Sequence, residues 1–103
     1  MLALTLEIDM QRITVSHLEA IIARINRATG SPAEPYVLGA DGRHHAQPGN
    51  YHLSRAYGGF CLHRMANEGG GAYNVFSCGH VPARDLANRM HAFIAGLDST
   101  RSE

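Results

Sequence analysis

Two short Cys-x-His units are the residues of this chain whose types and spacing could support chemistry. Cys61 and His63 form the first unit, and Cys78 and His80 form the second. Side chains two residues apart on a strand point to the same face of a sheet, so Cys61 and His63 are expected to be neighbours. Two thiolates and two imidazoles suit a tetrahedral zinc ion, which makes these four residues a candidate metal site.

The metal interpretation depends on how the chain folds back between the two units. If it reverses between Asn67 and Gly71, we expect position 61 to pair near position 77 or 78, and the two units then meet at the open end of a hairpin. Standard zinc motifs place two cysteines two to four residues apart, which this chain does not do. The alternative is a pair of half-buried thiols with surface histidines, and no cofactor.

A thiol nucleophile is a second interpretation of the same residues. A cysteine activated by a nearby histidine can act in covalent catalysis. Cys78 lies a few residues before an expected helix, where a thiolate would be favoured. No third residue that would orient the histidine is identifiable, so the sequence names no catalytic residue and favours a protein that is not an enzyme.

Histidines are frequent, with seven in 103 residues. His44 and His45, with His52 nearby, fall in or beside an expected long loop. They could bind a metal or respond to pH near neutrality. Surface histidines without a role are the alternative.

Arginine and tyrosine side chains near an expected sheet are the candidate interface. They are Arg55, Tyr57, Arg64 and Tyr73. Such residues can stack on nucleic-acid bases, and they are also frequent at the centre of protein interfaces. Because the formal net charge is zero, with nine basic and nine acidic residues, we expect a protein interface rather than a nucleic-acid one.

The first half of the chain predicts a strand, a helix and a loop. Residues 2–9 alternate apolar and polar side chains, the period of a half-buried strand. A helix is expected to begin with Ser16 in a capping box with Glu19 and to end at Gly30. Its apolar stripe is Leu18, Ile21, Ile22, Ile25 and Ala28, with Arg24, Asn26 and Arg27 facing away. Within the loop over residues 31–50, residues 36–38 predict a short strand.

The second half predicts a three-stranded antiparallel meander followed by a helix. Strands are expected over 51–56, 60–65 and 72–78, joined by turns at 57–59 and 67–71. The expected core face is Tyr51, Leu53, Phe60, Leu62, Tyr73 and Val75. The helix has Pro82 near its first turn and a stop near Gly96, and its apolar residues are Leu86, Met90, Phe93, Ile94 and Leu97.

These elements predict an α+β fold, with two amphipathic helices on one face of a small antiparallel sheet. Residues 1–97 are expected to form a single domain, and residues 98–103 a polar tail. The hydrophobic fraction of 45% is sufficient for a core. No apolar run is long enough to cross a membrane, and residues 1–9 lack the pattern of a signal peptide, so we expect a cytoplasmic protein with reduced thiols.

The second half also resembles a group of known proteins. The stretch from Tyr51 through Gly71, the run Pro82-Ala-Arg-Asp-Leu and the run Phe93-Ile-Ala-Gly resemble small uncharacterised proteins of bacteriophages and prophages. Those proteins combine a Tyr-Gly-Gly hairpin with a C-terminal helix that ends in a glycine. The resemblance implies a cytoplasmic accessory protein that binds a host or phage protein, and it implies no activity.

Three functions remain open at this point. The leading hypothesis is a non-enzymatic protein-interaction module that uses an exposed sheet face or an edge strand, by self-association or on another protein, and that inhibits or regulates it. The second is a metal-binding or thiol-dependent protein that uses the two Cys-x-His units, with zinc as the candidate metal. The third is a nucleic-acid-binding protein.

Overall fold

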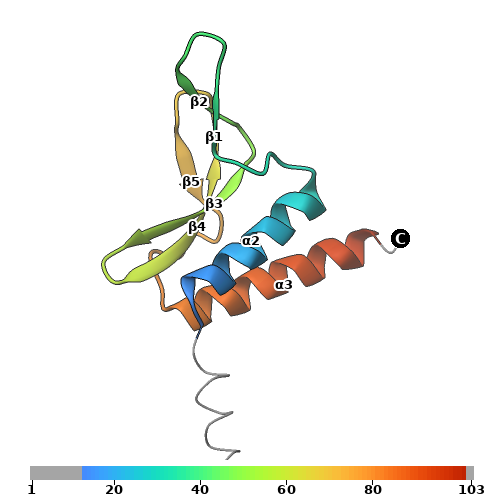
Figure 1. Ribbon diagram of the computed structural model, residues 1–103. Helices are drawn as coiled ribbons and strands as arrows, with labels where there is room; N and C mark the ends of the chain where they lie inside the picture. Colours follow the sequence, from blue (N-terminus) through green and yellow to red (C-terminus); the bar gives the residue numbers. More distant parts are fainter. Residues whose placement is uncertain (1–12, 102–103) are drawn as a thin grey trace, which may run out of the picture.

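The computed structural model describes residues 13–101, which form two helices and two antiparallel sheets. The helices are α2 (Val15–Thr29) and α3 (Ala83–Arg101). The strands are β1 (Tyr36–Leu38), β2 (His44–Ala46), β3 (Tyr51–Ala56), β4 (Gly59–Met65) and β5 (Ala72–Asn74). The α+β prediction is confirmed (Figure 1). The strand predicted over residues 2–9 lies outside the described residues.

Helix α2 begins two residues earlier than the capping box predicts. Thr14 is the N-cap, and its Oγ1 accepts a hydrogen bond from the His17 backbone N–H at 3.1 Å. Ser16 therefore lies inside the helix, and the predicted Ser16–Glu19 capping box is wrong. The other end is as predicted, since Gly30 adopts φ 69°, a left-handed conformation that glycine tolerates best.

The two helices lie side by side, run in the same direction and enclose the core against the larger sheet (Figure 1). An ion pair of 3.7 Å joins Arg24 and Asp98 near their C-terminal ends. The predicted stripes are largely correct, because their central residues are buried. The core comprises Leu18, Ile21, Ile22, Ile25, Tyr51, Leu62, Leu86, Ala87, Met90 and Ile94.

Helix α3 extends past its predicted end. Gly96 lies within the helix, which continues through Arg101 and so includes residues assigned to a polar tail by their composition. A Cβ atom at Gly96 would meet no atom within 4 Å, so no packing requirement fixes a glycine there. In the first turn, Asp85 forms a 3.0 Å ion pair with Arg89, one turn later.

Strands β3, β4 and β5 form the predicted meander in the order β3-β4-β5. Tyr57 and Gly58 have φ values of 54° and 74°, which is typical of a two-residue hairpin turn whose twist matches the strands. In register, Leu53 lies opposite Leu62, and His52 lies opposite His63. Tyr51 and Leu62 are in the core, so this side of the sheet is the helix face, and His52 and His63 point to the far face.

The predicted core face of the sheet is correct for four strand residues and wrong for one. Tyr51 and Leu62 are buried, and Leu53 and Phe60 pack partly buried against the core. Tyr73 is 48% exposed because it lies near the end of the sheet, beyond the cover of the helices. Val75 also packs against the core, although it follows β5 rather than belonging to a strand.

Strand β5 ends at Asn74, not at Cys78 as predicted. The chain then leaves the sheet and returns at Val81, which exchanges two backbone hydrogen bonds of 2.8 Å with Phe60. This return passes close to β4, because a Cβ atom at Gly59 would lie 3.0 Å from the carbonyl carbon of His80. Gly59 is therefore needed for close approach and belongs to β4 rather than to the turn.

Strands β1 and β2 pair as a separate hairpin that projects from the rest of the molecule (Figure 1). The strand over 36–38 was predicted, whereas its partner was expected to be loop. Gly42 in the turn has φ 79°, and Asp41 Oδ1 accepts a hydrogen bond from the Arg43 N–H at 3.0 Å. A short turn of this kind allows His44–Ala46 to pair with β1 despite an unremarkable strand sequence.

Candidate functional site

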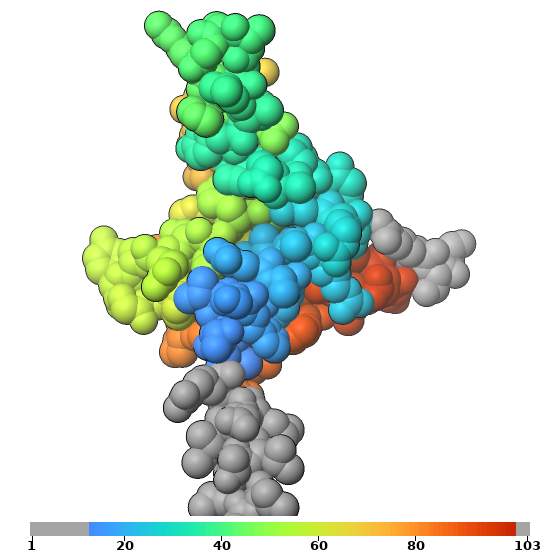
Figure 2. Space-filling view, viewed as in Figure 1, coloured from blue at the N-terminus to red at the C-terminus, as the bar shows by residue number. Residues whose placement is uncertain are grey.

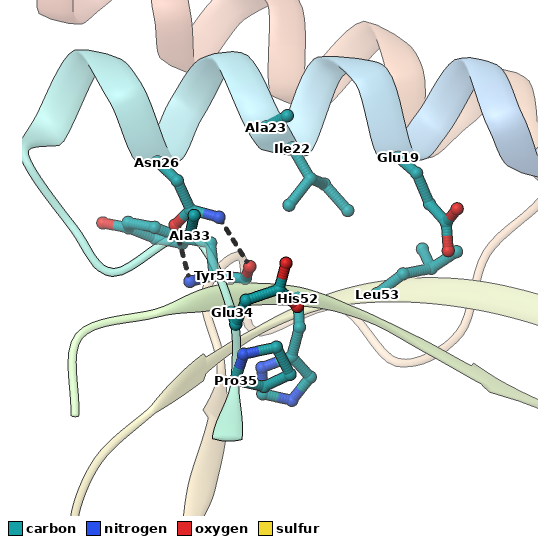
Figure 3. A pocket seen from close by; sticks show the side chains of 10 residues that line it. All are labelled: Glu19, Ile22, Ala23, Asn26, Ala33, Glu34, Pro35, Tyr51, His52 and Leu53. Atoms are coloured by element: carbon teal, nitrogen blue, oxygen red, sulfur yellow. Dashed lines mark hydrogen bonds between the residues drawn. The ribbon is translucent and has the colours of Figure 1, made fainter. Parts of the chain in front are cut away.

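A groove of about 470 Å³ runs between α2 and β3, and the segment that leads from α2 toward β1 borders it (Figure 3). Its volume falls within the range of ordinary ligand-binding clefts. Helix α2, the loop and the edge of β3 contribute its lining residues, which are Glu19, Ile22, Ala23, Asn26, Ala33, Glu34, Pro35, Tyr51, His52 and Leu53.

Asn26 fixes one end of the groove. Its Nδ2 donates to the Tyr51 carbonyl oxygen at 3.0 Å, and its Oδ1 accepts from the Tyr51 N–H at 2.9 Å (Figure 3). The amide thus makes the two bonds that a neighbouring strand would make. Asn26 is only 4% exposed, so the prediction that it faces away from the core is wrong. Its position four residues after Ile22 places it on the apolar stripe, a signal that sequence reasoning missed.

The remainder of the β3 edge is unpaired by other described residues. Phe60 bonds to Val81 and Leu62 to Val75, so alternate residues of β4, including Cys61, direct their backbone groups toward β3. Their partners on β3 are the even-numbered residues. The backbone N–H and C=O groups of Tyr51, Leu53 and Arg55 consequently point outward. Of these three residues, Asn26 forms hydrogen bonds only with the backbone of Tyr51.

The groove carries negative charge at neutral pH. Glu19 and Glu34 line it, and no arginine side chain that the structure describes does. The lining also contains one histidine, His52, and its pKa is lowered by burial and by the neighbouring His63. The His52 side chain is therefore neutral at pH 7 and does not offset the two carboxylates. Sequence reasoning missed both glutamates, because the cleft that joins them exists only in three dimensions.

A row of imidazoles lies on the far face of the sheet. The ring centroids of His52 and His63 are 5.9 Å apart, and those of His63 and His80 are 6.3 Å apart. Ser54 Oγ lies 3.0 Å from His80 Nε2, which fixes one ring nitrogen of His80. Burial, followed by the proximity of His80, lowers the pKa of His63. The sequence grouped His52 with His44 and His45, but the latter two are exposed on the separate hairpin.

The two Cys-x-His units approach each other without forming a ligand set. Cys61 lies opposite Ser54 on β3, and the predicted pairing near position 77 or 78 is wrong because β5 ends at Asn74. Burial, and then the neighbouring Cys78, raises the pKa of the Cys61 thiol, which disfavours a reactive thiolate. Among residues 13–101, no three His, Cys, Asp or Glu side chains are placed to hold a metal ion.

The four residues predicted for an interface fall into two pairs at opposite ends of the sheet. Arg55 lies near the end of β3, and Tyr57 lies in the β3–β4 turn, where it is 96% exposed. Arg64 and Tyr73 lie opposite one another on β4 and β5. Arg64 is already engaged within the fold, because its guanidinium stacks 4.8 Å from the Tyr51 ring centroid and its Nε donates to the Gly49 carbonyl oxygen at 3.1 Å.

Exposed apolar side chains gather on the projecting hairpin. Tyr36, Val37 and Leu38 of β1 are 48–62% exposed. Figure 2 shows this hairpin extending beyond the body formed by the helices and the meander. No helix among the described residues has the length and apolar character needed to cross a membrane.

Comparisons with known proteins found no relative of this chain. No protein-family model, no curated protein and no solved structure matches the chain, so its site is defined by its own geometry.

Proposed function

We propose that this protein is a protein-binding module that accepts an extended segment of another protein as an additional strand along β3. The observation that carries the proposal is the edge of β3 beside the groove. Asn26 pairs with the backbone groups of Tyr51, and those of Leu53 and Arg55 have no partner among residues 13–101. In binding by strand addition, main-chain hydrogen bonds supply affinity and neighbouring pockets supply specificity.

The arrangement of α2 and β3 supports this mode of binding. The helix runs beside the edge strand, and Ile22, Ala23 and Leu53 provide an apolar wall against which alternate side chains of an added strand would pack. A second hollow of about 290 Å³ borders Arg55 and Phe60 farther along β3. Leu53 and Arg55, the two open residues of the edge, therefore each border a hollow that an added strand could contact.

The charge of the groove supports a protein partner over a nucleic acid. A phosphate backbone is bound through arginine and lysine side chains, and the groove instead presents Glu19 and Glu34. The alternatives of a nucleic-acid-binding protein and of a zinc or thiol-dependent protein stay untested predictions. The cytoplasmic location and the regulation of a host or phage protein, which the bacteriophage resemblance implies, also stay predictions.

The test is a change that removes one donor from the edge of β3. Arg55→Pro deletes an outward N–H and leaves the donors and acceptors that bond to β4 in place, because proline is tolerated on an edge strand. Arg55→Ala is the matched control, since it shortens the same side chain and keeps the N–H. A peptide selected from a display library on the wild-type protein should bind Arg55→Ala by calorimetry and lose most of its affinity for Arg55→Pro.

A second measurement guards against a folding defect in the proline variant. The selected peptide is resynthesised with N-methyl groups at alternate residues, which removes its own main-chain donors on one side. One of the two methylation patterns should abolish binding to the wild-type protein, and the other should be tolerated. Equal binding of both patterns, or a selection that yields no peptide, would overturn the proposal.

A further inference from the structure

The groove beside β3 differs from an unspecific apolar cleft in one respect, which is its charge. Glu19 enters from α2, and Glu34 enters from the loop that leads to β1. Neither glutamate forms an ion pair with another residue in the described range 13–101. Two carboxylates that share one groove without a cation are electrostatically unbalanced, and a partner's positive charge would balance them.

Two arginines of the elements that border the groove are engaged elsewhere. Arg24 on α2 pairs with Asp98 at 3.7 Å, and the Arg55 guanidinium lies 5.7 Å from the centroid of the Phe60 ring. His52 is the one basic residue in the lining that the structure describes. It is half-buried, and its ring lies beside that of His63 on the far face of the sheet. Within residues 13–100, the lining of the groove therefore contains no side-chain cation at neutral pH.

Glu19 is also placed where an added strand would find open main-chain groups. Figure 3 shows its side chain beside Leu53, whereas Asn26 and Tyr51 lie together farther along the groove. Between them, Ile22 and Ala23 form an apolar wall. A long basic side chain can lay its methylene stem against such a wall and direct its charged group to a carboxylate.

From these contacts we infer that the segment bound along β3 is basic, with an arginine or lysine side chain that pairs with Glu19 and a second positive charge within reach of Glu34. This inference rests on the proposed strand addition and names the chemistry of its partner. An acidic or phosphorylated segment would meet like charge in the groove, which disfavours it.

The test compares selections on two forms of the full chain. A random peptide display library is selected on the wild-type protein and, separately, on Glu19→Gln/Glu34→Gln. Peptides from the wild-type selection should be enriched in arginine and lysine, and they should bind the double variant roughly 3- to 30-fold more weakly, the range expected for two partly exposed ion pairs. Their affinity for the wild-type protein should also fall as salt is raised to about 0.5 M.

A matched control separates local pairing from net charge. Glu68→Gln removes one negative charge, half of what the double variant removes, from the turn between β4 and β5, outside the groove, and should leave the affinity within about twofold. Peptides without a basic excess, or equal affinity for wild type and the double variant, would overturn the inference. If such peptides still lose binding to Arg55→Pro, strand addition stands and only its charge preference is wrong.

Discussion

Apolar strand residues are buried in one sheet of this molecule and exposed in the other. In the meander, Leu62 is fully buried against α2 and α3. In the hairpin, Leu38 is 62% exposed, although β1 consists of three apolar residues, Tyr36, Val37 and Leu38. The difference shows that an apolar strand is buried only where another element covers it, and both described helices cover the meander.

The largest expected effect of this difference is at the centre of the covered sheet. Leu62→Ala should lower the free energy of unfolding by about 2–5 kcal/mol, because it leaves a cavity among residues that are held by two helices. Urea unfolding followed by circular dichroism measures the loss. A decrease below about 1 kcal/mol would mean that the helices do not pack on the meander as described.

The next effect is at the junction between α2 and β3. Asn26→Ala should lower the free energy of unfolding by about 1–3 kcal/mol, because the N–H and C=O of Tyr51 lose their partner in a buried setting. Asn88→Ala on α3 is the control, since Asn88 is exposed and should cost less than about 0.5 kcal/mol. Similar losses of stability for the two variants would show that Asn26 does not stabilise the edge of β3.

A smaller effect is a loss of folding stability at acidic pH, caused by histidines of the meander. The pKa values of His52 and His63 in the folded protein lie below the ordinary value of 6.5, so the unfolded chain takes up protons first as the pH falls. Stability should be unaffected by these groups well above pH 6.5 and should decrease as the pH falls below it. Thermal melts across this range should show the decrease, and His63→Gln should reduce it.

The control for the acid effect is on the other sheet. His44→Gln replaces an exposed histidine of β2 and should leave the acid-dependent loss of stability as large as in the wild type. If His63→Gln and His44→Gln have the same effect, the proximity of His52, His63 and His80 does not govern the response to pH.

The smallest effect is expected on the uncovered sheet. Val37→Ser should change the free energy of unfolding by less than about 0.5 kcal/mol, because the side chain is already in contact with water. Native mass spectrometry on the same samples reports the oligomeric state. A loss above about 1 kcal/mol together with a dimer mass would show that a second copy covers β1 and would end the contrast between the sheets.

Much of the fold follows from local patterns in the sequence. The apolar stripes of α2 and α3 predicted which residues are buried, and the glycines near positions 58 and 70 predicted the turns of the meander, because helix periodicity and left-handed backbone conformations depend on nearby residues. Local patterns did not predict three of the boundaries of helices and strands. The start of α2, the end of β5 and the end of α3 depend on which of several adequate caps or pairings the whole fold stabilises.

The candidate site was much less predictable. The sequence brought attention to Cys61, His63, Cys78 and His80 through their spacing, and within residues 13–100 no three His, Cys, Asp or Glu side chains are grouped so that they could hold a metal ion. Glu19, Asn26 and Glu34 carry no motif. They share a groove only because α2 lies along β3 and the following loop turns back over it.

The sequence by itself determined the fold class, the two amphipathic helices and the order of the meander strands, since each depends on periodicity and turn chemistry within a few residues. Only the tertiary structure decided which part of the β3 edge is paired and which part is open. A single buried amide, Asn26, makes that difference by pairing with Tyr51 across 25 positions of sequence, a contact that no local pattern encodes.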